Sequence, residues 1–85
     1  MTELRYVIKD ELGIHARPAG LLVKKLAEFP CDIRVGTPDK MVDGKRIMAV
    51  MSLGLKCGAE MLLTFDGPQE ETASAEAETF LQSHL

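Results

Sequence analysis

The spacing of the apolar residues changes along this chain, and this change restricts the fold more than any other feature. At the start, Leu4, Tyr6 and Ile8 recur at every second position, which is typical of a half-buried strand over residues 3–9. From Ala16 onward the spacing becomes three and four, which predicts a helix with one apolar face. That face carries Ala19, Leu22, Val23 and Leu26.

The middle of the chain predicts a hairpin and a short helix. Ile33 and Val35 alternate with polar residues, Thr37-Pro38-Asp39 is a turn sequence, and residues 40–42 follow as a short returning strand. An apolar run over 47–53 ends at Gly54, which is typical of a two-turn helix with a glycine just past its end.

The last third of the chain predicts one strand and one helix. Residues 61–65 form an apolar segment of strand length, and Pro68 suits the first position of a helix. Glu70 and Glu71 would follow in the first turn, where the helix dipole favours acidic side chains. One face of this helix carries Ala73, Ala77, Phe80 and Leu81. The order β-α-β-β-α-β-α indicates an α+β fold, in which the helices can cover one face of an antiparallel sheet.

Length and composition exclude several classes of protein. At 85 residues, with no linker, repeat or low-complexity tract, the chain is expected to form a single domain. Cys31 and Cys57 are too few for a disulfide framework and lack metal-ligand spacing, which favours reduced thiols and a cytoplasmic location. The charged N-terminus and the lack of a run of roughly 20 apolar residues argue against a signal peptide and against membrane insertion.

The charge distribution argues against a nucleic-acid partner. The formal net charge is −3, and residues 66–85 contain acidic residues but no Lys or Arg. A small nucleic-acid module should show a basic face and exposed strand aromatics, yet this chain has 1 Tyr and 3 Phe.

The segment GIHARPAG, residues 13–20, places His15 at the start of a helix. Pro18 is tolerated only in the first turn, where its missing N–H is not needed, so the helix must begin close to His15. The first N–H groups of a helix have no internal partners and bind anions, above all phosphate. The positive helix end and Arg17 both disfavour an imidazolium, so one ring nitrogen is expected to keep a free lone pair.

A neutral imidazole at this position could attack a phosphoryl group and form an N-phosphohistidine. The product would accept hydrogen bonds from the N–H groups of Ala16 and Arg17 and from the Arg17 guanidinium, each worth about 1–2 kcal/mol. From the residues alone, a solvated surface pair of His15 and Arg17 stays open as the alternative. A metal site is the weaker reading, since His84 is the only other histidine, and no cofactor is expected.

GIHARPAG together with DGKRIMAVMSLG, residues 43–54, resembles the two signature stretches of the HPr family. These proteins are the histidine-containing phosphocarriers of the bacterial phosphoenolpyruvate-dependent sugar phosphotransferase system. The resemblance covers the whole chain, residues 1–85, as one HPr-like domain. It implies an open-faced sandwich with a four-stranded antiparallel sheet in the order 1-4-2-3 and three helices on one face.

The resemblance also implies a function that is not enzymatic in the strict sense. His15 would accept a phosphoryl group on Nδ1 from phosphorylated enzyme I and pass it to the IIA domains of sugar transporters, as a stoichiometric co-substrate. Arg17 would position and neutralise the phosphate, and Pro18 would set the helix start. We expect the carrier to be a monomer.

The second signature stretch predicts how partners dock. A two-turn helix cannot bury all its apolar residues, so parts of Ile47, Met48 and Met51 are expected to be exposed near the histidine. Burial of the whole set in the core is the alternative. Gly20 and Lys24, further along the first helix, would complete this docking surface.

Arg46 departs from the family pattern and also belongs to the predicted interface. Many relatives carry at this position a serine that a regulatory kinase phosphorylates, and that regulation cannot occur here. Arginine would instead keep a positive charge where an acidic partner docks. Gly20 also departs, since the family more often has a small side chain there. The alternative function is a regulatory or nitrogen-branch HPr-like paralogue that acts mainly by binding proteins.

Overall fold

The computed structural model describes residues 1–85, in which four strands form one antiparallel sheet. The strands are β1 (Thr2–Val7), β2 (Asp32–Thr37), β3 (Lys40–Asp43) and β4 (Glu60–Asp66), and the helices are α1 (Ala16–Leu26), α2 (Ile47–Met51) and α3 (Glu70–His84). The sheet order is β1-β4-β2-β3. Both the element order and the sheet order confirm the α+β open-faced sandwich predicted above.

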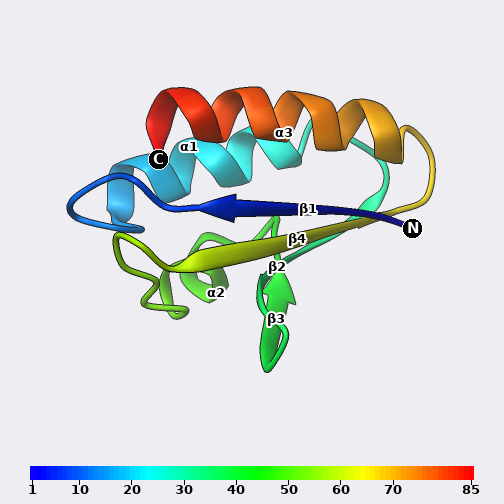
Figure 1. The fold of residues 1–85 in the computed structure, drawn as a ribbon. Coiled ribbons are helices and arrows are strands. Elements are labelled where there is room, and N and C mark those ends of the chain that lie inside the picture. Colours follow the sequence, from blue (N-terminus) through cyan, green and yellow to red (C-terminus); the bar gives the residue numbers. More distant parts are fainter.

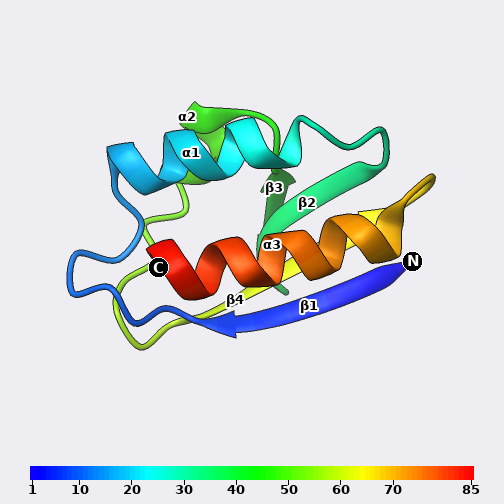
Figure 2. The same ribbon diagram turned by 90° about the horizontal axis from the view of Figure 1, so that it is seen from above.

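The two long helices lie side by side over one face of the sheet, as Figures 1 and 2 show. The short helix α2 packs against α1 and β3, on the side of α1 that faces away from α3 (Figure 2). No helix in the structure combines the length and the apolar character that a membrane span requires.

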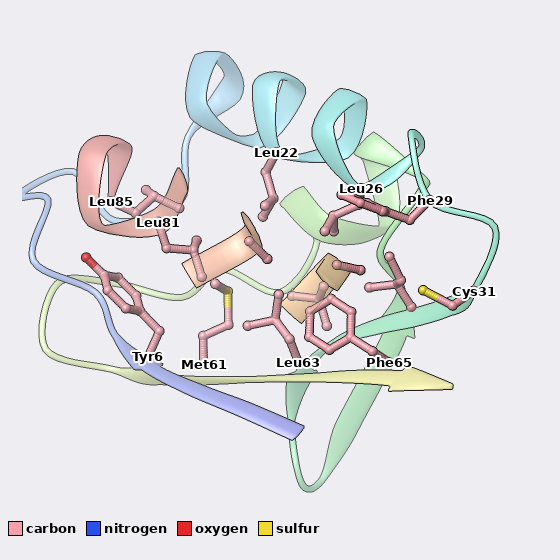
Figure 3. Packing of buried hydrophobic residues seen from close by; sticks show 14 of the residues in the cluster. Tyr6, Leu22, Leu26, Phe29, Cys31, Met61, Leu63, Phe65, Leu81 and Leu85 are labelled. Carbon is pink, nitrogen blue, oxygen red and sulfur yellow. The ribbon is translucent and has the colours of Figure 1, made fainter. Parts of the chain in front are cut away.

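The core fills the space between this helix layer and the sheet (Figure 3). The central strand β4 contributes Met61, Leu63 and Phe65, all fully buried, and Leu62 between them is also buried, at 7% exposure. The helices contribute fully buried residues at the predicted spacing: Ala19, Leu22 and Leu26 from α1, and Ala73, Ala77 and Leu81 from α3. Val23 and Phe80 are only partly buried.

Strand β1 is shorter than predicted and ends at Val7 rather than residue 9. Its partner β4 begins at Glu60, directly opposite Val7, so the regular ladder stops there. The N–H groups of Lys9 and Asp10 donate instead to the backbone oxygen of Leu85, at 2.6 and 2.9 Å. The segment after β1 is therefore tied to the end of α3.

Helix α2 ends at Met51, before the predicted boundary at residue 53. The N–H groups of Leu53 and Gly54 donate to residues three positions earlier, Val50 and Met51, which tightens the chain into a turn. Gly54 follows with φ +62°, in the left-handed region that a glycine past a helix end adopts.

Helix α3 begins at Glu70, so the prediction that Pro68 occupies its first position is wrong. Gln69 precedes the helix with φ 64°, a left-handed conformation that interrupts the helical path between Pro68 and Glu70. The predicted acidic first turn is present, with Glu70 and Glu71.

Glu70 also fastens β1 to the start of α3. Its carboxylate accepts hydrogen bonds from the Thr2 hydroxyl at 2.6 Å and from the Gly67 N–H at 3.3 Å, and lies 3.3 Å from the amino group of Met1. The Thr2 hydrogen bond, followed by that from Gly67, lowers the pKa of Glu70 below its ordinary value.

Lys45 connects the loop before α2 to the loop after α1. Its half-buried ammonium donates hydrogen bonds to the backbone oxygens of Phe29 at 2.7 Å and Cys31 at 2.8 Å. Both cysteines are free thiols, with Cys31 buried and Cys57 exposed.

Candidate functional site

His15 is the N-cap of α1, as the position of Pro18 predicts. Its backbone is extended (φ −132°, ψ 176°), its carbonyl accepts from the Ala19 N–H at 3.0 Å, and its side chain makes no capping hydrogen bond. Pro18 has no N–H, and the N–H groups of Ala16 and Arg17 have no acceptor within the molecule. Two backbone donors and an uncommitted ring therefore lie at the positive end of one helix.

The loop that carries His15 is held in a defined conformation. The Ile14 N–H donates to the Leu55 oxygen at 2.9 Å, and the Gly13 N–H donates to the Asp10 oxygen at 2.9 Å. Gly13 has φ +68°, and a Cβ there would lie 2.4 Å from the Leu55 oxygen, so only glycine fits. Gly13, the first residue of the motif, thus lets the chain pass close to the loop after α2.

Asp10, which was not among the predicted site residues, is a neighbour of His15. One oxygen of its carboxylate accepts from the Leu12 N–H at 2.8 Å, and the other, Oδ2, lies 3.6 Å from His15 Nε2. A carboxylate facing one ring nitrogen favours the tautomer with the proton on that nitrogen. For His15 this neighbour favours the tautomer with the proton on Nε2, in which the lone pair is on Nδ1.

His15 opens into a surface hollow of about 210 Å³. The hollow brings together three predicted site residues, His15, Arg17 and Pro18, and adds three that were not predicted there: Asp10, Leu21 and His84. The His15 side chain is 36% exposed, so a molecule that approaches from solvent can reach the ring. No signal in the local sequence places Asp10 or His84 here, because tertiary packing of the end of α3 against the loop after β1 brings them in.

The predicted docking residues lie outside this hollow. Ile47 is 39%, Met48 75% and Met51 36% exposed, whereas Val50 of the same helix is fully buried. Helix α2 therefore presents an apolar surface rather than burying all of its apolar residues. Gly20 lies against this surface, since a Cβ on it would be 3.4 Å from Ile47 Cδ1.

The two predicted basic interface residues line neither this hollow nor the other one in the molecule. Lys24 is exposed on α1, and Arg46 is the exposed N-cap of α2, with no capping hydrogen bond from its side chain. No group of three or more His, Cys, Asp or Glu side chains is close enough together to hold a metal ion.

Comparisons with known proteins match this fold and this motif. Residues 2–83 match the family model PTS-HPr, described as the PTS HPr component phosphorylation site. The chain is 43% identical over 74 residues to a phosphocarrier protein HPr of Pseudomonas aeruginosa, covering 86% of this chain and 82% of that protein.

Solved structures agree with the sequence comparisons. The crystal structure of HPr from Thermoanaerobacter tengcongensis superposes with a TM-score of 0.92 at 37% identity, covering 99% of this chain and 94% of the other. A phosphocarrier protein HPr of Bacillus anthracis gives a TM-score of 0.85 at 30% identity, covering 93% and 94%. A second structure of the Thermoanaerobacter protein, described as an HPr dimer, gives 0.77 at 37% identity and covers 98% and 95%. With the family model spanning nearly the whole sequence, the chain belongs to the HPr family of phosphocarriers of the phosphotransferase system.

Proposed function

We propose that this protein accepts a phosphoryl group from phosphorylated enzyme I on His15 and passes it to IIA domains of sugar transporters. The observation that carries the proposal is the placement of His15, a partly exposed N-cap whose ring faces a hollow beside two backbone N–H groups without acceptors. Such a helix end binds a phosphoryl group without enclosing it.

The transfer step follows from the ring geometry. With the Nε2 proton directed at Asp10, the Nδ1 lone pair of His15 attacks phosphorus. The bond between phosphorus and the donor atom breaks, and its electron pair returns to the donor. The same step in reverse, towards a IIA domain, restores the free imidazole, so the protein acts as a co-substrate that is regenerated each cycle.

The backbone and Arg17 would stabilise the phosphorylated form. The N–H groups of Ala16 and Arg17 would donate to the phosphoryl oxygens, and the exposed Arg17 guanidinium would offset their charge. Pro18 keeps the helix start at this position. Because the site is open to solvent, these contacts hold the group weakly enough for onward transfer.

The docking surface would be formed by Gly20 and Lys24 of α1 with Arg46, Ile47, Met48 and Met51. Support comes from the exposure of the three apolar side chains of α2 and from the near contact of Gly20 with Ile47. Flexible methionines can adapt to several differently shaped partners.

Incubation with phosphoenolpyruvate and enzyme I tests the proposal. The intact mass should rise by about 80 Da, the mass of one phosphoryl group, in an acid-labile form. Addition of a IIA domain should then remove it. A protein that stays unmodified would contradict carrier function. A protein that is phosphorylated but transfers nothing to any IIA domain would instead favour the regulatory or nitrogen-branch paralogue.

Arg46 offers a second test of the docking surface. If its exposed charge attracts an acidic partner, transfer from enzyme I should slow more steeply with added salt in the native protein than in Arg46→Ser. Equal slopes for the two proteins would rule out this role. We further propose that the carrier is a monomer. Sedimentation at working concentration would measure the mass of the species in solution.

A further inference from the structure

The hollow at His15 has a second imidazole in its wall. His84, the last residue of α3, lines it together with His15 and Arg17. Figures 1 and 2 both show the C-terminal end of α3 at the same end of the molecule as the start of α1. The two histidines, from opposite ends of the chain, therefore face one shared space.

Two sets of contacts hold His84 in place. Its ring stacks on Phe80, one turn earlier in α3, with ring centroids 4.3 Å apart and an interplanar angle of 29°. Phe80 itself packs against the core. The next residue, Leu85, accepts hydrogen bonds from the N–H groups of Lys9 and Asp10, which ties this end of α3 to the loop leading to His15.

The charged groups around the hollow leave room for a further hydrogen-bond donor to a phosphoryl group on His15. The Asp10 carboxylate, beside His15, repels a phosphoryl dianion, and Arg17 is the only permanently cationic side chain in the lining. Lys25, in the neighbouring hollow that His84 also lines, is engaged with Glu76 at 2.7 Å.

We propose that a ring N–H of His84 donates a hydrogen bond to an oxygen of the phosphoryl group carried by His15. This inference rests on the function proposed above. His84 forms no covalent bond in the step, and its contact stabilises the phosphorylated protein relative to the free one. His15, His84 and Asp10 do not form a metal site, because their side chains are not close enough together to hold one ion.

The equilibrium constant for phosphoryl transfer from enzyme I measures this contact. The constant depends only on the free proteins, so contacts that exist only in the docked complex do not change it. His84→Ala should lower it about threefold to tenfold. Gln82→Ala, an exposed change on the same turn of α3 that touches neither hollow, should leave it unchanged. Thermal unfolding of both variants verifies that they are folded.

A measurement on the native protein makes the test independent of any variant. The ring ¹⁵N resonances of His84 should move when His15 is phosphorylated. An unchanged equilibrium constant in His84→Ala, or unmoved His84 ring resonances in a protein that is demonstrably phosphorylated, would overturn the proposal. Failure of the native protein to accept phosphate at all would instead overturn the carrier function on which it rests.

Discussion

Lys45 is expected to contribute more to stability than any other lysine, because its ammonium bridges two backbone oxygens. Lys45→Met keeps the apolar stem but removes the hydrogen bonds to Phe29 and Cys31, at 2.7 and 2.8 Å. A hydrogen bond from a charged donor contributes about 1.5–3 kcal/mol when buried. Because Lys45 is only partly buried, each of its two hydrogen bonds is expected to contribute an energy at the lower end of this range. The side-chain entropy that is recovered when these bonds are lost offsets about 1 kcal/mol of their combined energy.

The expected cost of Lys45→Met is therefore about 2 kcal/mol of the free energy of unfolding. For a domain of this size that corresponds to a fall in Tm of about 8–16 °C. Urea denaturation should show a lower midpoint with an unchanged m-value. Lys56→Met, at an exposed lysine whose side chain makes no hydrogen bond or ion pair, is the matched control. If the two variants agree within about 0.5 kcal/mol, the bridging role of Lys45 is wrong.

Two further predictions concern stability. The pKa of Glu70 is depressed in the folded protein, chiefly by the hydrogen bond from the Thr2 hydroxyl. The stability that the Glu70 carboxylate contributes is therefore present at pH values above the pKa it has in the unfolded chain. It is lost as the pH falls through the pKa it has in the folded protein. Urea midpoints measured from pH 6 downward to about pH 3 should therefore fall less in Glu70→Gln than in the native protein, and parallel curves would contradict this. Gly20→Ala should stabilise α1 by about 0.5–1 kcal/mol, since the new methyl group would meet Ile47 at an ordinary contact distance of 3.4 Å. Thermal unfolding measures the change in stability. A lower Tm would show that Ile47 cannot accommodate the methyl group.

Local patterns in the sequence predict most of the fold. The alternation of Met61, Leu63 and Phe65 with Leu62 and Thr64 indicates β4, and Pro18 limits α1 to a start close to His15. Both signals act within one strand or one helical turn. The C-terminal end of α2 and the start of α3 were not predicted correctly. They depend on a tightened turn after Met51 and on the left-handed backbone of Gln69, which no apolar spacing indicates.

The residues of the site, like the elements of the fold, are only partly predictable from the sequence. The helix-start chemistry of GIHARPAG indicates His15 and Arg17 directly, and the short apolar helix indicates an exposed Met48. Asp10 and His84 could not be found this way. Their proximity to His15 depends on the backbone oxygen of Leu85 accepting hydrogen bonds from the loop after β1, a contact between the two ends of the sequence.

The most direct test of the account is radiolabel transfer from phosphoenolpyruvate through enzyme I to three proteins: the native chain, His15→Ala and Gln82→Ala. Denaturing electrophoresis at alkaline pH would preserve the label. The native chain and Gln82→Ala should both be labelled, and His15→Ala should carry none. A label that remains on His15→Ala would contradict the claim that the His15 ring at the start of α1 carries the phosphoryl group.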